Sequence, residues 1–162
     1  MRSIRLAVTA TLMIMVAFAQ QPAQPPKLFA SSSDVMALIA KAKSDRKEGQ
    51  PMVSERILSL APYNANLEYR TAVAPASVHE TEAEMFYVID GTATMVIGGK
   101  LVDEKRTNAA NLSGTSIEGG MSREIAKGDF IMVPEGTPHG FSKINGTLVL
   151  MTLHLAHPVP GK

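Results

Sequence analysis

The sequence contains no cysteine. The protein therefore forms no disulfide bond, and it cannot be a lipoprotein anchored through an acylated cysteine. The chain also lacks a nucleophile elbow, a phosphate-binding loop and a dinucleotide fingerprint. These absences argue against serine hydrolases, P-loop nucleotide enzymes and nicotinamide-dependent oxidoreductases.

Neither sign of charge is in large excess. Lysine and arginine together number 16, and aspartate and glutamate number 15. Residues 1–19 hold Arg2, Arg5 and no acidic residue, so without them 14 basic residues face 15 acidic ones. A nucleic-acid partner would favour a basic stripe, and docking on anionic lipid would favour a basic cluster. We therefore expect neither nucleic acid nor, after cleavage of the N-terminus, a membrane as a partner.

The sequence has one long uncharged apolar run, which extends from Leu6 to Ala19 after a basic start. Ala17-Phe18-Ala19 fits the small-x-small pattern that precedes a signal-peptidase site. An uncleaved anchor is the alternative, but the run is shorter than the ~20 residues of a spanning helix. The pattern predicts a signal peptide over residues 1–19 and export to the periplasm or beyond. An exported protein without disulfides depends on its core, or on bound metal, for stability.

Residues 20–50 predict a tether followed by one helix. Gln20–Lys27 holds three prolines and three glutamines, which is typical of a disordered tether. Ser31–Ser33 offers an N-cap, and Gly49-Gln50-Pro51 provides a stop. Between them, apolar residues at helical spacing predict an amphipathic helix of about twelve to fifteen residues that lies on a sheet or on a partner subunit.

From residue 51 to residue 157 the pattern changes to short strands. Runs such as 53–60, 67–73 and 147–155 alternate apolar with polar or small residues, and glycine-containing turns separate the runs. This pattern predicts a single all-β domain, an antiparallel barrel or sandwich. Asp103–Gly120 is polar and predicts a long loop over the barrel mouth. Residues 158–162 are expected to form a tail, and His157 lies next to it.

Two stretches of this region carry candidate chemistry. Residues 77–91 read SVHETEAEMFYVIDG, and residues 128–139 read GDFIMVPEGTPH. Each places a histidine beside a strand-like run, and the first adds a carboxylate five residues after its histidine. Two imidazoles and one carboxylate from separate strands would form a metal site with open coordination positions.

These stretches resemble the two sequence motifs of the cupin superfamily. In the second motif Gly128, Pro134, Gly136 and His139 fit, whereas Lys143 replaces the usual asparagine. In the first motif Glu84 and Gly91 fit, and His79 takes the place of the second histidine. Ser77 then stands where the first histidine would be, and Thr71 where the opening glycine would be. An alternative register makes His79 the first histidine and Thr81 the substitute for the second.

The resemblance implies a jelly-roll (double-stranded β-helix) barrel, a homodimer and a metal site. Such sites typically consist of three histidines and one glutamate, of which His79, Glu84 and His139 carry over. Ser77, or a water molecule, is the candidate for the fourth position, and Glu80 or Glu82 could replace the missing ligand. Fe(II), Mn(II) or Zn(II) is the expected cofactor, one ion per chain.

Two functions are compatible with this resemblance. The first is a metal-dependent enzyme (a dioxygenase, isomerase or decarboxylase) that acts on a small organic acid, sugar or aromatic compound. The second is a small-molecule-binding protein without turnover, in which the metal site is partly lost.

The expected ligand pocket follows from strand alternation. If Glu84 points into the barrel, Phe86 and Val88 do so too, and Phe141 follows His139. With Tyr69 these residues predict a mostly apolar pocket above a polar metal floor. Glu82 and Tyr69 are candidates for proton transfer, and His154 on the last strand is a further histidine that can face the pocket.

Overall fold

The computed structural model describes residues 25–156, and all structural statements below refer to this part of the chain. The signal-peptide prediction, residues 20–24 of the tether, and residues 157–162 with His157 lie outside it. Among the described residues, no helix combines the length and the hydropathy needed to cross a membrane.

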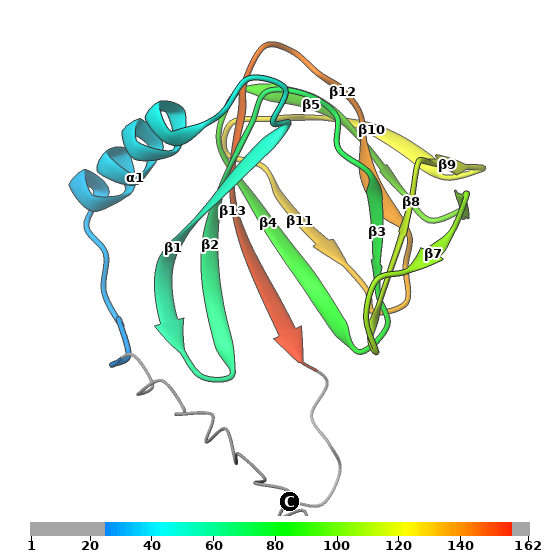
Figure 1. Cartoon of the computed structure of the whole chain (residues 1–162), viewed down its shortest axis with the longest axis horizontal. Coiled ribbons are helices and arrows are strands. Elements are labelled where there is room, and N and C mark those ends of the chain that lie inside the picture. The colour runs from blue at the N-terminus through cyan, green and yellow to red at the C-terminus, as the bar shows by residue number, and fades with distance from the viewer. Residues whose placement is uncertain (1–24, 157–162) are drawn as a thin grey trace, which may run out of the picture.

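Two antiparallel sheets face each other and enclose the main core (Figure 1). The first has the order β1-β2-β13-β4-β11, formed by Met52–Leu60, Tyr63–Arg70, Leu148–Ala156, Glu82–Asp90 and Phe130–Val133. The second has the order β10-β5-β12-β3-β8-β7, formed by Met121–Ala126, Thr92–Ile97, His139–Ile144, Ala76–His79, Asn111–Gly114 and Lys105–Arg106. A separate two-stranded ribbon pairs β6 (Lys100–Val102) with β9 (Ser116–Glu118). The predicted all-β barrel with one helix is confirmed.

Helix α1 (Ser32–Asp45) begins where the sequence predicts. The Ser31 hydroxyl accepts the Asp34 backbone N–H at 3.2 Å, and the Asp34 carboxylate accepts the Ser31 N–H at 2.8 Å. This reciprocal capping box satisfies two otherwise unpaired donors of the first turn. The helix packs on β1 and β2, and the Lys41 ammonium also pairs with Glu55 of β1.

The apolar residues divide into two clusters because the sheet next to the helix is covered on both sides. The barrel interior holds one cluster, which includes the fully buried Val88 and Leu150. The second cluster lies between α1 and the outer face of the five-stranded sheet, around the fully buried Leu67 and Ala42. Successive residues of a strand point to opposite faces. The apolar residues of β2 therefore face the helix, and its polar residues face the barrel interior.

Three sequence-based boundaries need correction. Lys27 is not part of a disordered tether, because its backbone N–H and C=O both bond to Ser59 at 2.9 Å. The second strand of the barrel covers residues 63–70 rather than 67–73. The stretch Asp103–Gly120 is not a long loop, because it contains β7, β8 and β9, and β8 pairs with β3 inside the larger sheet.

Candidate metal centre

Glu84 lies at the centre of a cluster of polar side chains inside the barrel. Its residue is only 4% exposed, and it alternates with the inward-facing Phe86 and Val88 along β4. In the sheet register Glu84 stands opposite His154 of β13 and Val133 of β11. A carboxylate buried in this way requires charged or hydrogen-bonding partners.

Two histidines from the opposite sheet supply partners on one oxygen of Glu84. Nε2 of His139 lies 2.9 Å from Oε2, and Nε2 of His79 lies 3.3 Å from the same atom. The two imidazole centroids are 5.3 Å apart. The predicted convergence of His79, Glu84 and His139 is therefore present in the structure.

The remaining nitrogens of these rings face carbonyl oxygens. Nδ1 of His139 lies 3.0 Å from the Thr137 carbonyl, and Nδ1 of His79 lies 2.7 Å from the Asn111 side-chain oxygen. In both rings Nδ1–H is the donor, so in the neutral imidazole Nε2 carries a lone pair. Two lone pairs aimed at one carboxylate oxygen repel it unless a proton or a cation lies between them. Metal-ligating histidines are commonly oriented by such an N–H to carbonyl contact.

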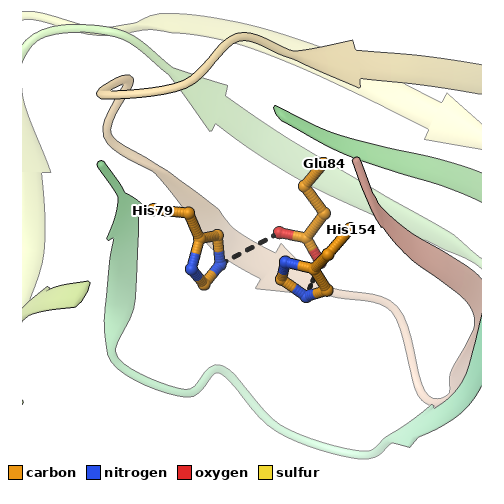
Figure 2. Close-up of side chains that lie close together, drawn as sticks. All are labelled: His79, Glu84 and His154. Atoms are coloured by element: carbon orange, nitrogen blue, oxygen red, sulfur yellow. Dashed lines mark ion pairs between the residues drawn. The ribbon is translucent and has the colours of Figure 1, made fainter. Parts of the chain in front are cut away.

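A third histidine approaches from the opposite side (Figure 2). Nε2 of His154 lies 3.5 Å from Oε1 of Glu84, and its Nδ1 lies 3.2 Å from Oε2 of Glu82. The contact with Glu82 is close enough for an ion pair, but its direction does not suit a hydrogen bond. In the described part of the chain Nδ1 is therefore buried without a hydrogen bond. His79, Glu84 and His154 can each contribute one metal-ligating atom, and these three atoms lie within 4.8 Å of one another. His154, not His139, completes this three-residue donor group.

The cluster shifts the titration of its members in opposite directions. Burial raises the pKa of the Glu84 carboxyl, but hydrogen bonds from His139 and His79 outweigh burial and bring this pKa down to about 2. Burial lowers the pKa of His79, but its hydrogen bonds with Glu84 and Asn111 outweigh that effect and raise the pKa above 6.5. A proton and a metal ion thus compete for the same nitrogen.

The pocket above the cluster is polar, contrary to the expected apolar lining. It encloses about 360 Å³ and reaches His79 and His154 at its floor, and its other walls are Arg56, Pro62, Asn64, Asn66, Glu82 and Asn111. The prediction that Tyr69 lines this pocket is wrong, because Tyr69 packs in the cluster under helix α1. Val88 lies in the closed core. Phe86 and Phe141 line a separate cavity of about 30 Å³ beside His139.

Ser77 and Thr81, the two candidates for the missing ligand, have different positions. Ser77 stands opposite His139 in the sheet and borders the small cavity, and within residues 25–156 its side chain makes no hydrogen bond to the cluster. Thr81 is exposed in the turn between β3 and β4. Glu80 forms a surface ion pair with Arg106 at 2.6 Å, and Lys143 is exposed on β12. Of the acidic alternatives, only Glu82 lies beside the cluster.

The sequence indicates His154 only as a further histidine of the last strand, and it does not indicate Arg56, Asn64, Asn66 or Asn111 as site residues. One signal for His154 was available, because it shares the alternation of Leu148, Leu150 and Thr152, which face the interior. Similarly, Asn64 and Asn66 occupy the polar face of a strand whose apolar face covers the helix. No local pattern indicates Asn111, because its role depends on the pairing of β8 with β3.

Comparison with known proteins identifies the family. The sequence profile of the cupin family matches residues 52–154. This chain belongs to the cupin family. No curated protein sequence matches it.

Solved structures agree with the fold. KdgF from Halomonas sp. is similar at 15% identity and a TM-score of 0.50, over 69% of this chain and 86% of that one. FeII HppE is similar at 15% identity and a TM-score of 0.50, over 68% of this chain and 54% of that one. The chain thus spans about half the length of HppE. At such identities the likeness concerns the fold alone.

Proposed function

We propose that this protein is a metal-dependent cupin that holds one divalent transition metal with Glu84, His79, His139 and His154. The observation that carries the proposal is the orientation of His79 and His139. Both rings donate Nδ1–H to a carbonyl oxygen and direct Nε2 at the same buried carboxylate oxygen. Imidazole and carboxylate donors suit Fe(II), Mn(II) and Zn(II).

Each side chain has a distinct part in this centre. Thr137 and Asn111 hold the rings of His139 and His79, and Glu84 supplies the compensating negative charge. A bound ion would supply Lewis acidity toward an oxygen atom of the ligand. Glu82, which borders the pocket beside His154, is positioned to accept or deliver a proton there.

The proposal extends to catalysis on a small polar organic molecule. The loss of a histidine at Ser77 favoured a binding protein with a decayed site, but His154 brings the number of imidazoles around Glu84 to three. The polar pocket favours an organic acid or a sugar over an aromatic compound. The family includes enzymes and binding proteins, so turnover must be measured directly.

Metal content tests the centre. Protein purified without a histidine tag and loaded with Mn(II), Fe(II) or Zn(II) should retain about one ion per chain. His79→Ala and His154→Ala should lose most of it, whereas Ser77→Ala, the matched control on β3, should retain it. Circular dichroism verifies that each variant is folded. Wild-type protein that retains less than a tenth of an ion per chain would refute the metal centre.

Turnover is tested separately with the loaded protein. Consumption of oxygen and loss of substrate are followed over a panel of hydroxy acids and sugars, with the metal-free protein as the control. A loaded protein that binds a panel member without converting it would indicate a binding protein.

Export and dimerisation complete the proposal. Export is supported by the basic start, the apolar run and the small residues of positions 1–19, and sequencing of the mature N-terminus should begin at Gln20.

A homodimer would use the outer face of β11, where Phe130 and Met132 are 70% and 52% exposed. Helix α1, which the sequence places on a sheet or on a partner subunit, packs on β1 and β2 of the same chain. Sedimentation of wild type and Phe130→Ser tests this interface.

A further inference from the structure

The pocket above the cluster presents hydrogen-bonding groups that the fold itself does not use. Arg56 of β1 stands opposite Asn66 of β2, and Asn64 lies two residues before Asn66 on the same face of that strand. Within residues 25–156 the structure records no hydrogen bond or ion pair for these three side chains. By contrast, Arg70 pairs with Glu68 at 2.7 Å, and Asn111 is engaged by His79 at 2.7 Å.

The three free groups line one wall of the cavity whose floor is formed by His79 and His154. The cavity volume of about 360 Å³ falls within the range of roughly 300–1,000 Å³ that small-molecule sites occupy. No phenylalanine, tyrosine or tryptophan is among its described lining residues. The wall therefore offers one guanidinium and two amides, which recognise polar ligands rather than flat apolar rings.

The chemistry of this wall specifies the ligand further. A guanidinium binds a carboxylate with two parallel hydrogen bonds. An asparagine amide offers both donors and an acceptor, which matches hydroxyl groups. Here the guanidinium and the amides are neighbours across one strand pair, so a carboxylate and hydroxyl groups would be bound by adjacent side chains.

The charge of the loaded pocket favours a single negative charge on the ligand. A dication and Arg56 contribute three positive charges, and Glu82 and Glu84 contribute two negative ones. One positive charge remains in excess. This balance favours a monocarboxylate over a neutral sugar and over a dianionic phosphate ester.

We propose that the pocket binds a polyhydroxylated monocarboxylic acid, a sugar acid, with its carboxylate on Arg56 and its hydroxyl groups on Asn64 and Asn66. This inference rests on the proposed metal centre, because the charge balance includes the bound ion.

Calorimetric titration of the Mn(II)-loaded protein tests the inference with three matched probes. D-gluconate has both groups, D-glucitol replaces the carboxylate with a hydroxymethyl group, and hexanoate has the carboxylate without hydroxyls. Gluconate should bind at least ten times more tightly than either of the others. Equal or tighter binding of glucitol or hexanoate, or no binding of any of the three, would overturn the proposal.

Variants of the pocket wall test which side chains contact gluconate. Arg56→Gln and Asn66→Leu should each weaken gluconate binding at least tenfold without changing the metal content. Arg123→Gln, which removes an exposed arginine of β10 outside the pocket, should leave gluconate binding unchanged. If Arg56→Gln bound gluconate as tightly as wild type, Arg56 would not be the partner of the carboxylate.

The metal content of each sample separates the two proposals. A protein that retains no metal but binds gluconate through Arg56 refutes the metal centre and the charge balance, and supports the contact between Arg56 and the carboxylate. A protein that retains one metal per chain and binds no probe supports the centre and refutes the ligand assignment.

Discussion

Acid should destabilise the metal-free protein mainly through Glu84. The folded chain holds this carboxylate ionised, because His139 and His79 stabilise its negative charge more than burial disfavours it. In the unfolded chain the carboxyl has its ordinary pKa of 4.5, and in the folded chain its pKa is about 2. A group whose pKa is depressed by folding contributes stability above the unfolded pKa and loses that stability as the pH falls toward the folded pKa.

The magnitude follows from the two pKa values. A difference of about 2.5 units corresponds to about 3 kcal/mol of unfolding free energy at neutral pH. By pH 3, about 2 kcal/mol of this contribution should be lost. The contribution of His79 to the unfolding free energy changes with pH in the opposite direction, because the pKa of His79 is raised in the folded state. Its contribution is present below pH 6.5 and is lost as the pH rises through the raised pKa, so the interaction is strongest between the two limits.

Denaturant unfolding in the presence of chelator measures this contribution from pH 7 to pH 3. Glu84→Gln removes the titrating group but preserves the shape of the side chain, so its unfolding free energy should fall with acid by about 2 kcal/mol less than that of wild type. Glu118→Gln, an exposed position on β9, should follow the wild-type curve. Parallel curves for wild type and Glu84→Gln would refute the reasoning, because Glu84 would then have the same pKa in both states.

Three further predictions follow from the packing and the cluster. His154→Ala should weaken metal binding at least about tenfold. Adding Ser77→His to His154→Ala should restore metal binding, because it returns an imidazole to β3. The absorption spectrum of bound Co(II) measures both effects, and a double variant that does not regain metal would show that β3 cannot supply the ligand. Gly91→Ala should lower the unfolding free energy by more than about 2 kcal/mol, because the φ of 88° is strained for alanine and the new Cβ would lie 2.0 Å from the Thr147 carbonyl oxygen. Gly98→Ala, with open space around the Cβ, should cost only about 1 kcal/mol, and equal losses would contradict the clash. Ser31→Ala should cost about 1 kcal/mol of stability by removing the N-cap of α1, measured by thermal or denaturant unfolding, and an unchanged midpoint would contradict the role of the capping box.

The parts of the fold that could be predicted from sequence are those with a local cause. The helix was predictable because Ser31 and Asp34 sit three residues apart ahead of an apolar stripe. The strands around Glu84 and His139 were predictable because alternation and turn residues recur at short intervals. The strands within 103–120 were not, because they are only two to four residues long and mostly polar. They are stabilised by pairing with distant partners, such as Val78 opposite Leu112.

The lining of the pocket was predicted wrongly because alternation identifies two faces but does not say which faces inward. In β2 the apolar face, with Leu67 and Tyr69, covers helix α1. Its polar face then points into the barrel. The same strand would have its apolar face inward in a barrel without a covering helix, so the orientation of Tyr69 depends on a segment some thirty residues earlier in the chain.

The sequence motifs contain fewer histidines than the structure brings close to Glu84. The first motif lacks a histidine at Ser77, yet three imidazoles approach Glu84, because its two carboxylate oxygens face different strands. Oε2 faces His79 and His139 of the six-stranded sheet, and Oε1 faces His154 of β13, which pairs directly with β4. A carboxylate placed between two sheets accepts partners from either of them. The imidazole that is missing at Ser77 of β3 is therefore matched by the imidazole of His154 on β13, and His154 belongs to neither motif.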